Sequence, residues 1–314
     1  MIHNVEQLRA RIANSLKDIS PEHTDKGHFY RINTPNKDGI SGLIYPSVTG
    51  KIQIIKDEGL INYKKNRALD YMYKHFKEFT DENIEEHLKL ADRVPEDILT
   101  EAGDIGRDVH DIREVIFKNI IAGKHVDDFL SFIPPSKPDV RIRSAIRALS
   151  AFCRDYKYIP IVTESFVYSH KLKVAGTLDD IGLITKTVRE GTPGCVHEVT
   201  YNNNNESICL KCGFKEKQFL VLMDLKTSNQ FKDHYFFQVA LYYQMFVALT
   251  DIRPEICFIL KVSKEDGTYK IEELKNITKL AMYARSMLKT NEGISFIKSV
   301  RKDNQKIVGE KIEL

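Results

Sequence analysis

Residues 221–226 read Val-Leu-Met-Asp-Leu-Lys, and this short run carries the clearest structural signal in the chain. Three apolar residues lead into an acid and a base that are separated by one leucine. Because side chains alternate between the two faces of a strand, Asp224 and Lys226 are expected on the same face of a buried strand. Charges are costly to bury unless they pair or share a ligand. Taken alone, this acid and base are better explained as an ion pair at the edge of a sheet.

A second pair of acids lies upstream, where residues 175–182 read Ala-Gly-Thr-Leu-Asp-Asp-Ile-Gly. Together with residues 161–169 this segment predicts an antiparallel hairpin. Strand alternation lets only one of Asp179 and Asp180 face the same side as a neighbouring site. Two carboxylates that converge on a sheet suit a hard cation such as Mg²⁺, which prefers oxygen ligands.

The periodicity along the rest of the chain sets the fold class. Residues 28–47 are rich in Asn, Gly, Pro and Lys and are expected to form an exposed turn region. The other expected elements are helices over 52–78 and 81–92, a helix that begins near Pro95 and ends at Gly123, a helix from Ser136 to about Lys157, the hairpin after Pro160, the strand ending at Lys226, a helix over 233–249, a strand over 255–262, a turn over 265–268 and a last helix over 277–297. This order predicts an α+β fold rather than repeated βαβ units.

The composition is that of an ordinary globular protein. The 314 residues are 42% hydrophobic and 29% charged, and 47 Lys and Arg against 44 Asp and Glu give a net charge of +3, so any nucleic-acid surface must be a local groove. No apolar run is long enough to cross a bilayer, and Val5, Leu8, Ile12 and Leu16 predict a core-packed helix where a signal peptide would lie. We therefore expect a cytoplasmic protein without a membrane partner.

Residues 191–217 interrupt the strand pattern and contain three closely spaced cysteines. Cys209-x-x-Cys212 followed by glycine is typical of half of a zinc ribbon, and Cys195-x-His197 is a tighter second half, so these four residues are the expected Zn²⁺ ligands. The alternative is a reduced cysteine pair without metal. A polar insertion of this size could hardly bury enough surface to fold unaided, which favours zinc. Cys153 and Cys257 are expected to be buried apolar residues.

Three motifs occur in a fixed order: Gly176-x-x-Asp179, Asp224-x-Lys226 and Gln238-x-x-x-Tyr242. In this order they resemble the RecB-type branch of the PD-(D/E)XK nuclease superfamily, and the resemblance covers about residues 45–262. It implies a restriction-endonuclease-like core, with a mixed central sheet flanked by helices. It also favours Asp179 over Asp180 as the catalytic acid, through the G-x-x-D spacing, although an apolar residue commonly stands where this chain has Asp180.

The same resemblance implies roles for the site residues. His110, in a G-x-x-x-H helix, would bind Mg²⁺ or Mn²⁺ with Asp179, Asp224 and the backbone carbonyl of Leu225, and Lys226 would position or activate water. The DNA-binding or supporting residues would be Gln238, Tyr242, Glu164, Glu114, Ser47 and Thr49. Five of these have a plainer interpretation: Gln238 and Tyr242 as polar residues on a core helix, Glu164 as half of a surface ion pair, and Ser47 and Thr49 as a helix N-cap.

The expected organisation is a helical N-terminal region over 1–100, a nuclease core over 101–190 and 218–314, and the zinc-binding insertion over 191–217. The expected function is that of a metal-dependent deoxyribonuclease, an exonuclease that acts on DNA ends, preferably single-stranded, in replication, repair or recombination. A replication or recombination protein is a possible partner. Phage-type and mitochondrial genome-maintenance exonucleases carry similar motifs, and a phage-encoded protein would act in the host cytoplasm. The alternatives are a structure-specific endonuclease and a non-catalytic DNA-binding scaffold that recruits partners through its zinc ribbon.

Overall fold

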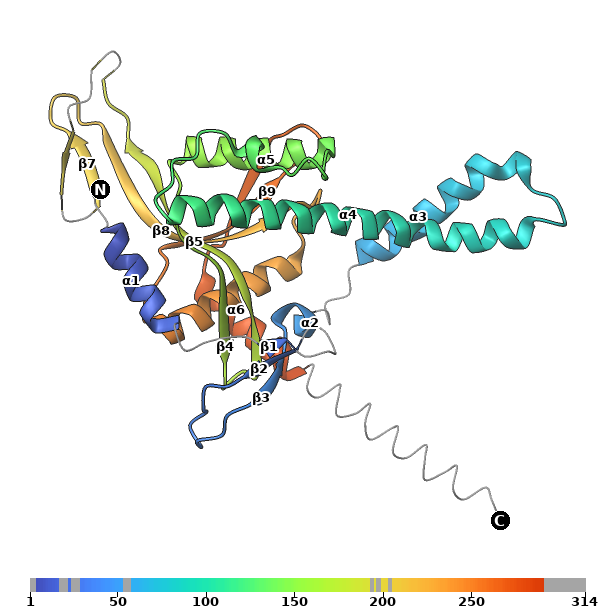
Figure 1. Ribbon diagram of the computed structural model, residues 1–314, viewed down its shortest axis with the longest axis horizontal. Coiled ribbons are helices and arrows are strands. Elements are labelled where there is room, and N and C mark those ends of the chain that lie inside the picture. Colours follow the sequence, from blue (N-terminus) through green and yellow to red (C-terminus); the bar gives the residue numbers. More distant parts are fainter. Residues whose placement is uncertain are drawn as a thin grey trace.

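The computed structural model describes residues 4–16, 22–23, 29–52, 58–192, 195, 199–202 and 205–290. At its centre is a mixed sheet in the order β10-β9-β8-β5-β4, in which β8 and β9 are parallel and the other neighbours are antiparallel (Figure 1). The strands are β4 (Ile159–Ser169), β5 (Val174–Arg189), β8 (Lys215–Lys226), β9 (Ile256–Val262) and β10 (Tyr269–Glu273). The α+β class, with helices around a mixed sheet, is the one that the sequence predicts.

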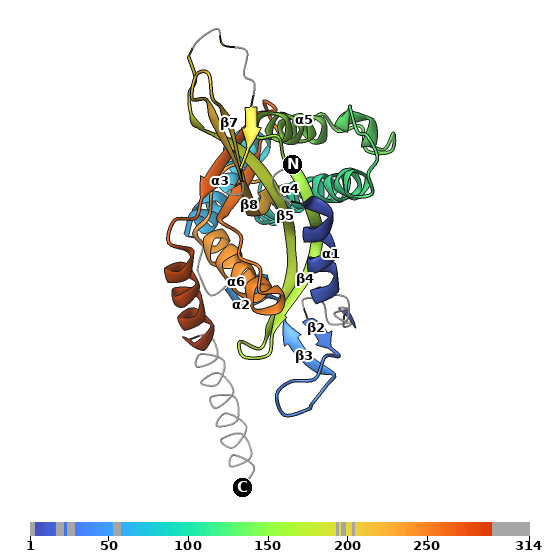
Figure 2. The same ribbon diagram turned by 90° about the vertical axis from the view of Figure 1, so that its left-hand side faces the viewer.

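Helices cover both faces of this sheet. On one face, α4 (Ile84–Ile121) and α5 (Val140–Asp155) share an apolar core with β8 and β9. On the other face, α1 (Val5–Leu16), α2 (Val48–Ile52) and α6 (Asp233–Thr250) share a second core with β4 and β5. Figure 2 shows α1 and α6 lying along the β4–β5 pair. Because both faces are packed, the buried stretches of β5 and β8 are mostly apolar, and the charged residues within them need a specific partner.

The long helix α4 differs from the prediction. Its apolar stripe includes Ile105, Val109 and Ile116, as expected, but the helix does not begin at Pro95. It starts at Ile84 and runs through the proline for 38 residues. A proline inside a helix removes one hydrogen bond. Here Pro95 is buried and α3 (Glu58–His75) packs beside it, so contacts between the two helices offset the missing bond.

The first half of α4 and all of α3 extend away from the sheet as a two-helix arm, residues 58–98 (Figure 1). The predicted helix over 52–78 is thus divided between α2 and α3, with residues 53–57 outside the described part of the chain, and the one predicted over 81–92 belongs to α4. Of the predicted last helix, residues 277–290 are described and are helical. None of the helices in the described ranges is both long and apolar enough to span a bilayer.

Two strand regions were not predicted. The supposed turn region over 28–47 contains β2 (Phe29–Ile32) and β3 (Leu43–Pro46), which form a small sheet with β1 (Glu22–His23). Tyr45 of β3 packs against Phe166 and Tyr168 of β4, so distant aromatic residues stabilise a segment whose own composition is turn-like. The edge strand β10 was also missed, because its five residues are mostly polar and depend on pairing with β9.

The cysteine-bearing insertion is a β-hairpin. Strands β6 (Val199–Tyr201) and β7 (Glu206–Cys209) pair with each other, and β7 also pairs with β8. Figure 1 shows this hairpin on the opposite side of the molecule from the arm.

Candidate active site

Three separate elements converge where β5 and β8 part. The register of this pair runs as far as Asp180 opposite Met223. Beyond it, the carboxylate of Asp179 accepts a hydrogen bond from the backbone N–H of Leu225, at 2.7 Å. His110 of α4 lies alongside, with 3.8 Å between its Nδ1 and Oδ2 of Asp179, and it also hydrogen-bonds to the backbone of Leu225. The peptide groups of one residue thus orient both side chains.

A cavity of about 740 Å³ opens at this point. Its lining contains His110, Asp179, Lys226, Gln238, Tyr242 and Thr49 among the residues predicted from sequence. The other lining residues are Tyr30, Ala102, Gly103, Gly106, Arg107, Asp111, Thr177, Thr227, Ser228, His234, Tyr235 and Lys264. The cavity thus combines aromatic rings, several cations and two acids, which is a suitable lining for an anionic ligand that carries flat groups.

Asp224 lies directly behind the cavity rather than on its wall. It is 1% exposed, and the Nζ atom of Lys226 is 2.6 Å from its Oδ2. Lys226 pairs with Oδ2 of Asp224, whereas within the described residues Oδ1 of Asp224 has no hydrogen-bond partner. Burial raises the pKa of Asp224 to about 6, and Lys226 opposes that shift. A buried carboxylate in this condition has unused capacity for a cation.

The charge states favour metal binding at Asp179 and His110. Burial lowers the pKa of His110 to about 4, so its imidazole is neutral near pH 7 and can act as a ligand. Burial would raise the pKa of Asp179, but His110, Arg113 and Lys226 outweigh it and lower that pKa overall. For Lys226, burial would lower the pKa, yet Asp224 and Asp179 raise it, so the side chain is an ammonium group. In this state it supplies positive charge and cannot accept a proton.

The two adjacent acids of β5 point in different directions. Asp179 borders the cavity, whereas Asp180 is fully buried and lies 2.7 Å from Nη1 of Arg113. Glu164 of β4 also turns towards the site, and its backbone has a φ of 47°. His110, Glu164 and Asp179 each offer one ligand atom, and these atoms all lie within 4.8 Å of one another. One imidazole and several carboxylates are a donor set that suits Mg²⁺ or Mn²⁺.

The remaining predicted residues have distinct positions. Gln238 donates a hydrogen bond to the hydroxyl of Tyr242 at 3.3 Å. Both residues are buried in α6 and also border the cavity, so they contribute to the core and to the cavity wall. Gly176 leaves room for the ring of Tyr242, because a Cβ atom at residue 176 would lie 2.9 Å from that ring.

Of three other predicted residues, one borders the cavity and two do not. The Ser47 hydroxyl accepts from the N–H of Gly50 at 3.0 Å and so caps α2, while Thr49 borders the cavity. Glu114 pairs with Lys118 at 2.5 Å and is not part of the cavity lining.

Several site residues were missed by sequence reasoning. Tyr30 comes from the region expected to be a turn, and nothing in its surroundings marks it. Tyr235 lies beneath the ammonium of Lys226, with 5.0 Å from Nζ to the ring centre. In the sequence it is one of several aromatic residues of the same helix, so nothing distinguishes it from a core residue. Arg113 alone had a usable signal, because it is a cation one turn after His110 among buried apolar residues.

The cysteines of the insertion form a second group able to hold a metal ion. The sulfur atoms of Cys195, Cys209 and Cys212 lie within 4.8 Å of one another. A tight turn makes this possible: the N–H of Gly213 donates to the carbonyl of Cys209, and Gly213 has a φ of +72°. His197, the fourth predicted ligand, lies outside the described residues. Of the remaining cysteines, Cys257 is buried and Cys153 is half-buried.

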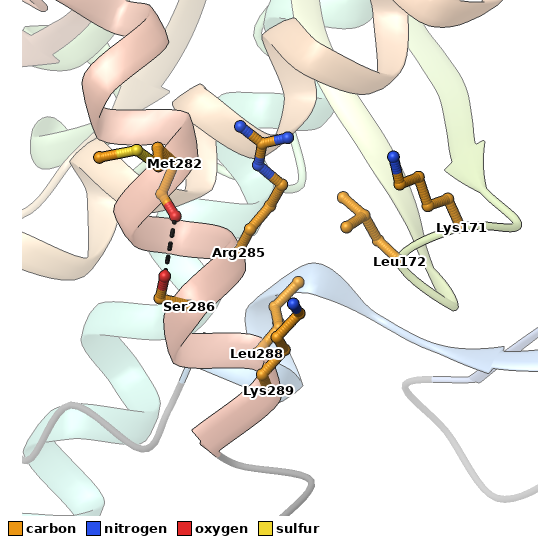
Figure 3. Close-up of a pocket in the computed structure, with 7 residues that line it drawn as sticks. All are labelled: Lys171, Leu172, Met282, Arg285, Ser286, Leu288 and Lys289. Atoms are coloured by element: carbon orange, nitrogen blue, oxygen red, sulfur yellow. Dashed lines mark hydrogen bonds between the residues drawn. The ribbon is translucent and has the colours of Figure 1, made fainter.

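A second cavity, of about 370 Å³, lies between the β4–β5 turn and the helix over 277–290 (Figure 3). It is lined by Lys171, Leu172, Met282, Arg285, Ser286, Leu288 and Lys289. This lining contributes three cations and no carboxylate or imidazole from the described residues, so it does not offer a metal site.

Comparison with known proteins adds little. No family model matches the chain, and no curated protein matches it. Among solved structures, the crystal structure of SSO0001 aligns with 59% of this chain and 72% of its own, at 12% sequence identity and a TM-score of 0.22. A likeness this distant carries no argument about function.

Proposed function

We propose that this protein is a Mg²⁺- or Mn²⁺-dependent nuclease that hydrolyses DNA from its ends. The observation that carries the proposal is the meeting of His110, Asp179 and Lys226 at one cavity, with the buried carboxylate of Asp224, paired with Lys226, directly behind it. These residues come from α4, β5 and β8, and simple structural ion pairing does not require all of them to face one opening.

The residues divide the chemistry among them. His110, Glu164 and Asp179 would hold the divalent ion, with Asp224 behind them as a further acid, and the bound ion would acidify water and offset charge on the scissile phosphate. Lys226, as an ammonium group, orients the attacking water and stabilises the negative charge that develops on the phosphate. Gln238 and Tyr242 donate or accept hydrogen bonds at the wall where the strand would lie.

The preference for ends and for single strands rests on the resemblance in sequence motifs and on the lining of the cavity. Tyr30 and Tyr235 offer rings for stacking exposed bases, and Arg107 and Lys264 offer cations for the backbone. Bases are available for stacking in this way only when they are unpaired. A terminal single strand therefore suits the cavity better than intact duplex.

The direct test is digestion of DNA of different topology. With Mg²⁺, we expect end-labelled linear single strands to be degraded, linear duplex to be degraded more slowly, and covalently closed circles to survive; a chelator should stop all hydrolysis. Gel electrophoresis of the labelled products gives the result. Cleavage of closed circles would instead indicate the endonuclease. Binding of DNA without hydrolysis of any substrate, with either metal, would leave the scaffold as the function.

We propose further that Cys195, Cys209 and Cys212 bind a structural Zn²⁺ ion, since three thiolates in reach of one another suit that ion. We expect about one zinc per chain by plasma mass spectrometry. The double variant Cys209→Ser, Cys212→Ser should lose it, whereas Cys153→Ser, outside the insertion, should keep it. Equal zinc content in the two variants would contradict the assignment.

A further inference from the structure

Arg113 is the most deeply buried charged side chain at the site. It is 0% exposed and lies on α4, one turn beyond His110. Its Nη1 is 2.7 Å from Oδ2 of Asp180 and 3.6 Å from Oδ2 of Asp179, and its Nη2 pairs with Glu164. Burying a guanidinium group is costly unless its partners are well placed. Here a single fork contacts three carboxylates, two of which belong to the group that can hold a metal.

These contacts separate the two neighbouring acids of β5. Asp180 faces the side of the sheet covered by α4 and α5, and Arg113 is its partner there. Asp179 is left with the N–H of Leu225 and the imidazole of His110, which hold it towards the cavity. Without the cation, Asp179, Asp180 and Glu164 would repel one another at short range. Arg113 thus makes the presence of an extra acid beside Asp179 tolerable.

The same guanidinium group acts on Glu164. That residue has a φ of 47°, a left-handed conformation in which a side chain other than glycine is strained. Nη2 of Arg113 holds its carboxylate within 4.8 Å of the His110 and Asp179 ligand atoms. A strained backbone persists only where its surroundings fix it, and such places cluster at functional sites.

We propose that Arg113 is a positioning residue that aligns the carboxylates of Glu164 and Asp179 for a divalent cation, by pairing with Glu164 directly and by holding Asp180 away. The inference rests on the proposed metal-dependent function. It requires the geometry of a planar fork, because one group must reach Asp180 and Glu164 from different nitrogen atoms. A lysine carries the same charge but cannot make both contacts.

The test measures Mn²⁺ binding by titration calorimetry, on zinc-loaded protein without DNA. Asp179→Ala identifies the binding event at this site by abolishing it. Arg113→Lys keeps the charge and is expected to weaken that event by about 10- to 100-fold, as loss of a group that orients ligands usually does. The matched control is Arg141→Lys on α5, a half-exposed arginine that pairs with Asp139 and Glu101 away from the site and should leave Mn²⁺ affinity unchanged.

A second variant keeps the proposal open to refutation if Arg113→Lys does not fold. Asp180→Asn leaves the arginine in place but removes the negative charge of its partner, so Arg113 should shift towards Asp179 and weaken Mn²⁺ binding as well. Circular dichroism at the titration temperature establishes that each variant is folded. Wild-type Mn²⁺ affinity in folded Arg113→Lys, or in Asp180→Asn, would overturn the proposal and reduce Arg113 to a structural ion pair. Site-specific Mn²⁺ binding by a wild-type protein that hydrolyses no DNA would instead refute only the nuclease function.

Discussion

The variant Lys226→Ala should hydrolyse DNA about 10²- to 10³-fold more slowly than the wild type, the usual loss when one preorganised group for developing charge is removed. Lys226 is the only charged group here that combines an ammonium state, a place on the cavity wall and a contact with Asp224, among the residues that the structure describes. The rate constant under saturating Mg²⁺ and substrate is the quantity to measure.

Lys261 provides a matched control for this substitution. It occupies the position opposite Lys226 in the parallel β8–β9 pair, and it likewise lies over an aromatic ring, that of Phe231. Its ammonium group donates to the carbonyl of Asn229 and does not line the cavity. Lys261→Ala should therefore keep its hydrolysis rate within a factor of about 3, far below the loss expected at a group for developing charge. An equal loss in both variants, or full activity in Lys226→Ala, would show that the ammonium of Lys226 has no part in catalysis.

The second large effect concerns stability. A Cβ atom on Gly182 would clash with two ring atoms and the hydroxyl oxygen of Tyr158, and that ring is itself packed against Phe117 and Phe152. Because the core has no space to receive it, Gly182→Ala should lower the free energy of unfolding by about 1–3 kcal/mol. Urea denaturation followed by circular dichroism measures the change.

A partner substitution separates the clash from a general effect of alanine. Tyr158→Leu removes the ring, so adding Gly182→Ala to it should cost clearly less than in the wild-type background. Gly103→Ala, in helix α4 with its nearest contact at 3.8 Å, should be neutral or stabilising. Equal losses from Gly182→Ala in the two backgrounds would mean that Tyr158 is not the obstacle.

The pattern of apolar residues in the sequence predicted those helices and strands that depend mainly on residues near them in the chain. The β4–β5 hairpin, the strand that ends in Asp224 and Lys226, and helix α6 all follow from periodicity within a few residues of their ends. Cys209 and Cys212 are brought together, as their spacing indicates, because a tight turn after β7 needs only short-range geometry. These features depend on neighbours in sequence, which is why the sequence alone is sufficient for them.

The rest depends on contacts between distant segments. The strands over 29–46 are stabilised by aromatic residues of β4, and Pro95 remains inside a helix because α3 packs beside it. The candidate site shows the same division. The order of its motifs indicated Asp179 and Lys226, but the partners of Arg113 become clear only when α4 packs against β4 and β5, since they are 51 and 67 residues away.

Helix α4 runs without interruption from the arm to the candidate site. At about 1.5 Å per residue, His110 lies roughly 22 Å along the axis from Pro95, and the start of the helix lies roughly 16 Å on the other side. Pro95 is the weakest point of the helix, because one backbone hydrogen bond is missing there. The arm and the imidazole nevertheless belong to one continuous helix, whose segment around His110 is packed against the sheet by Ile105, Val109 and Ile112.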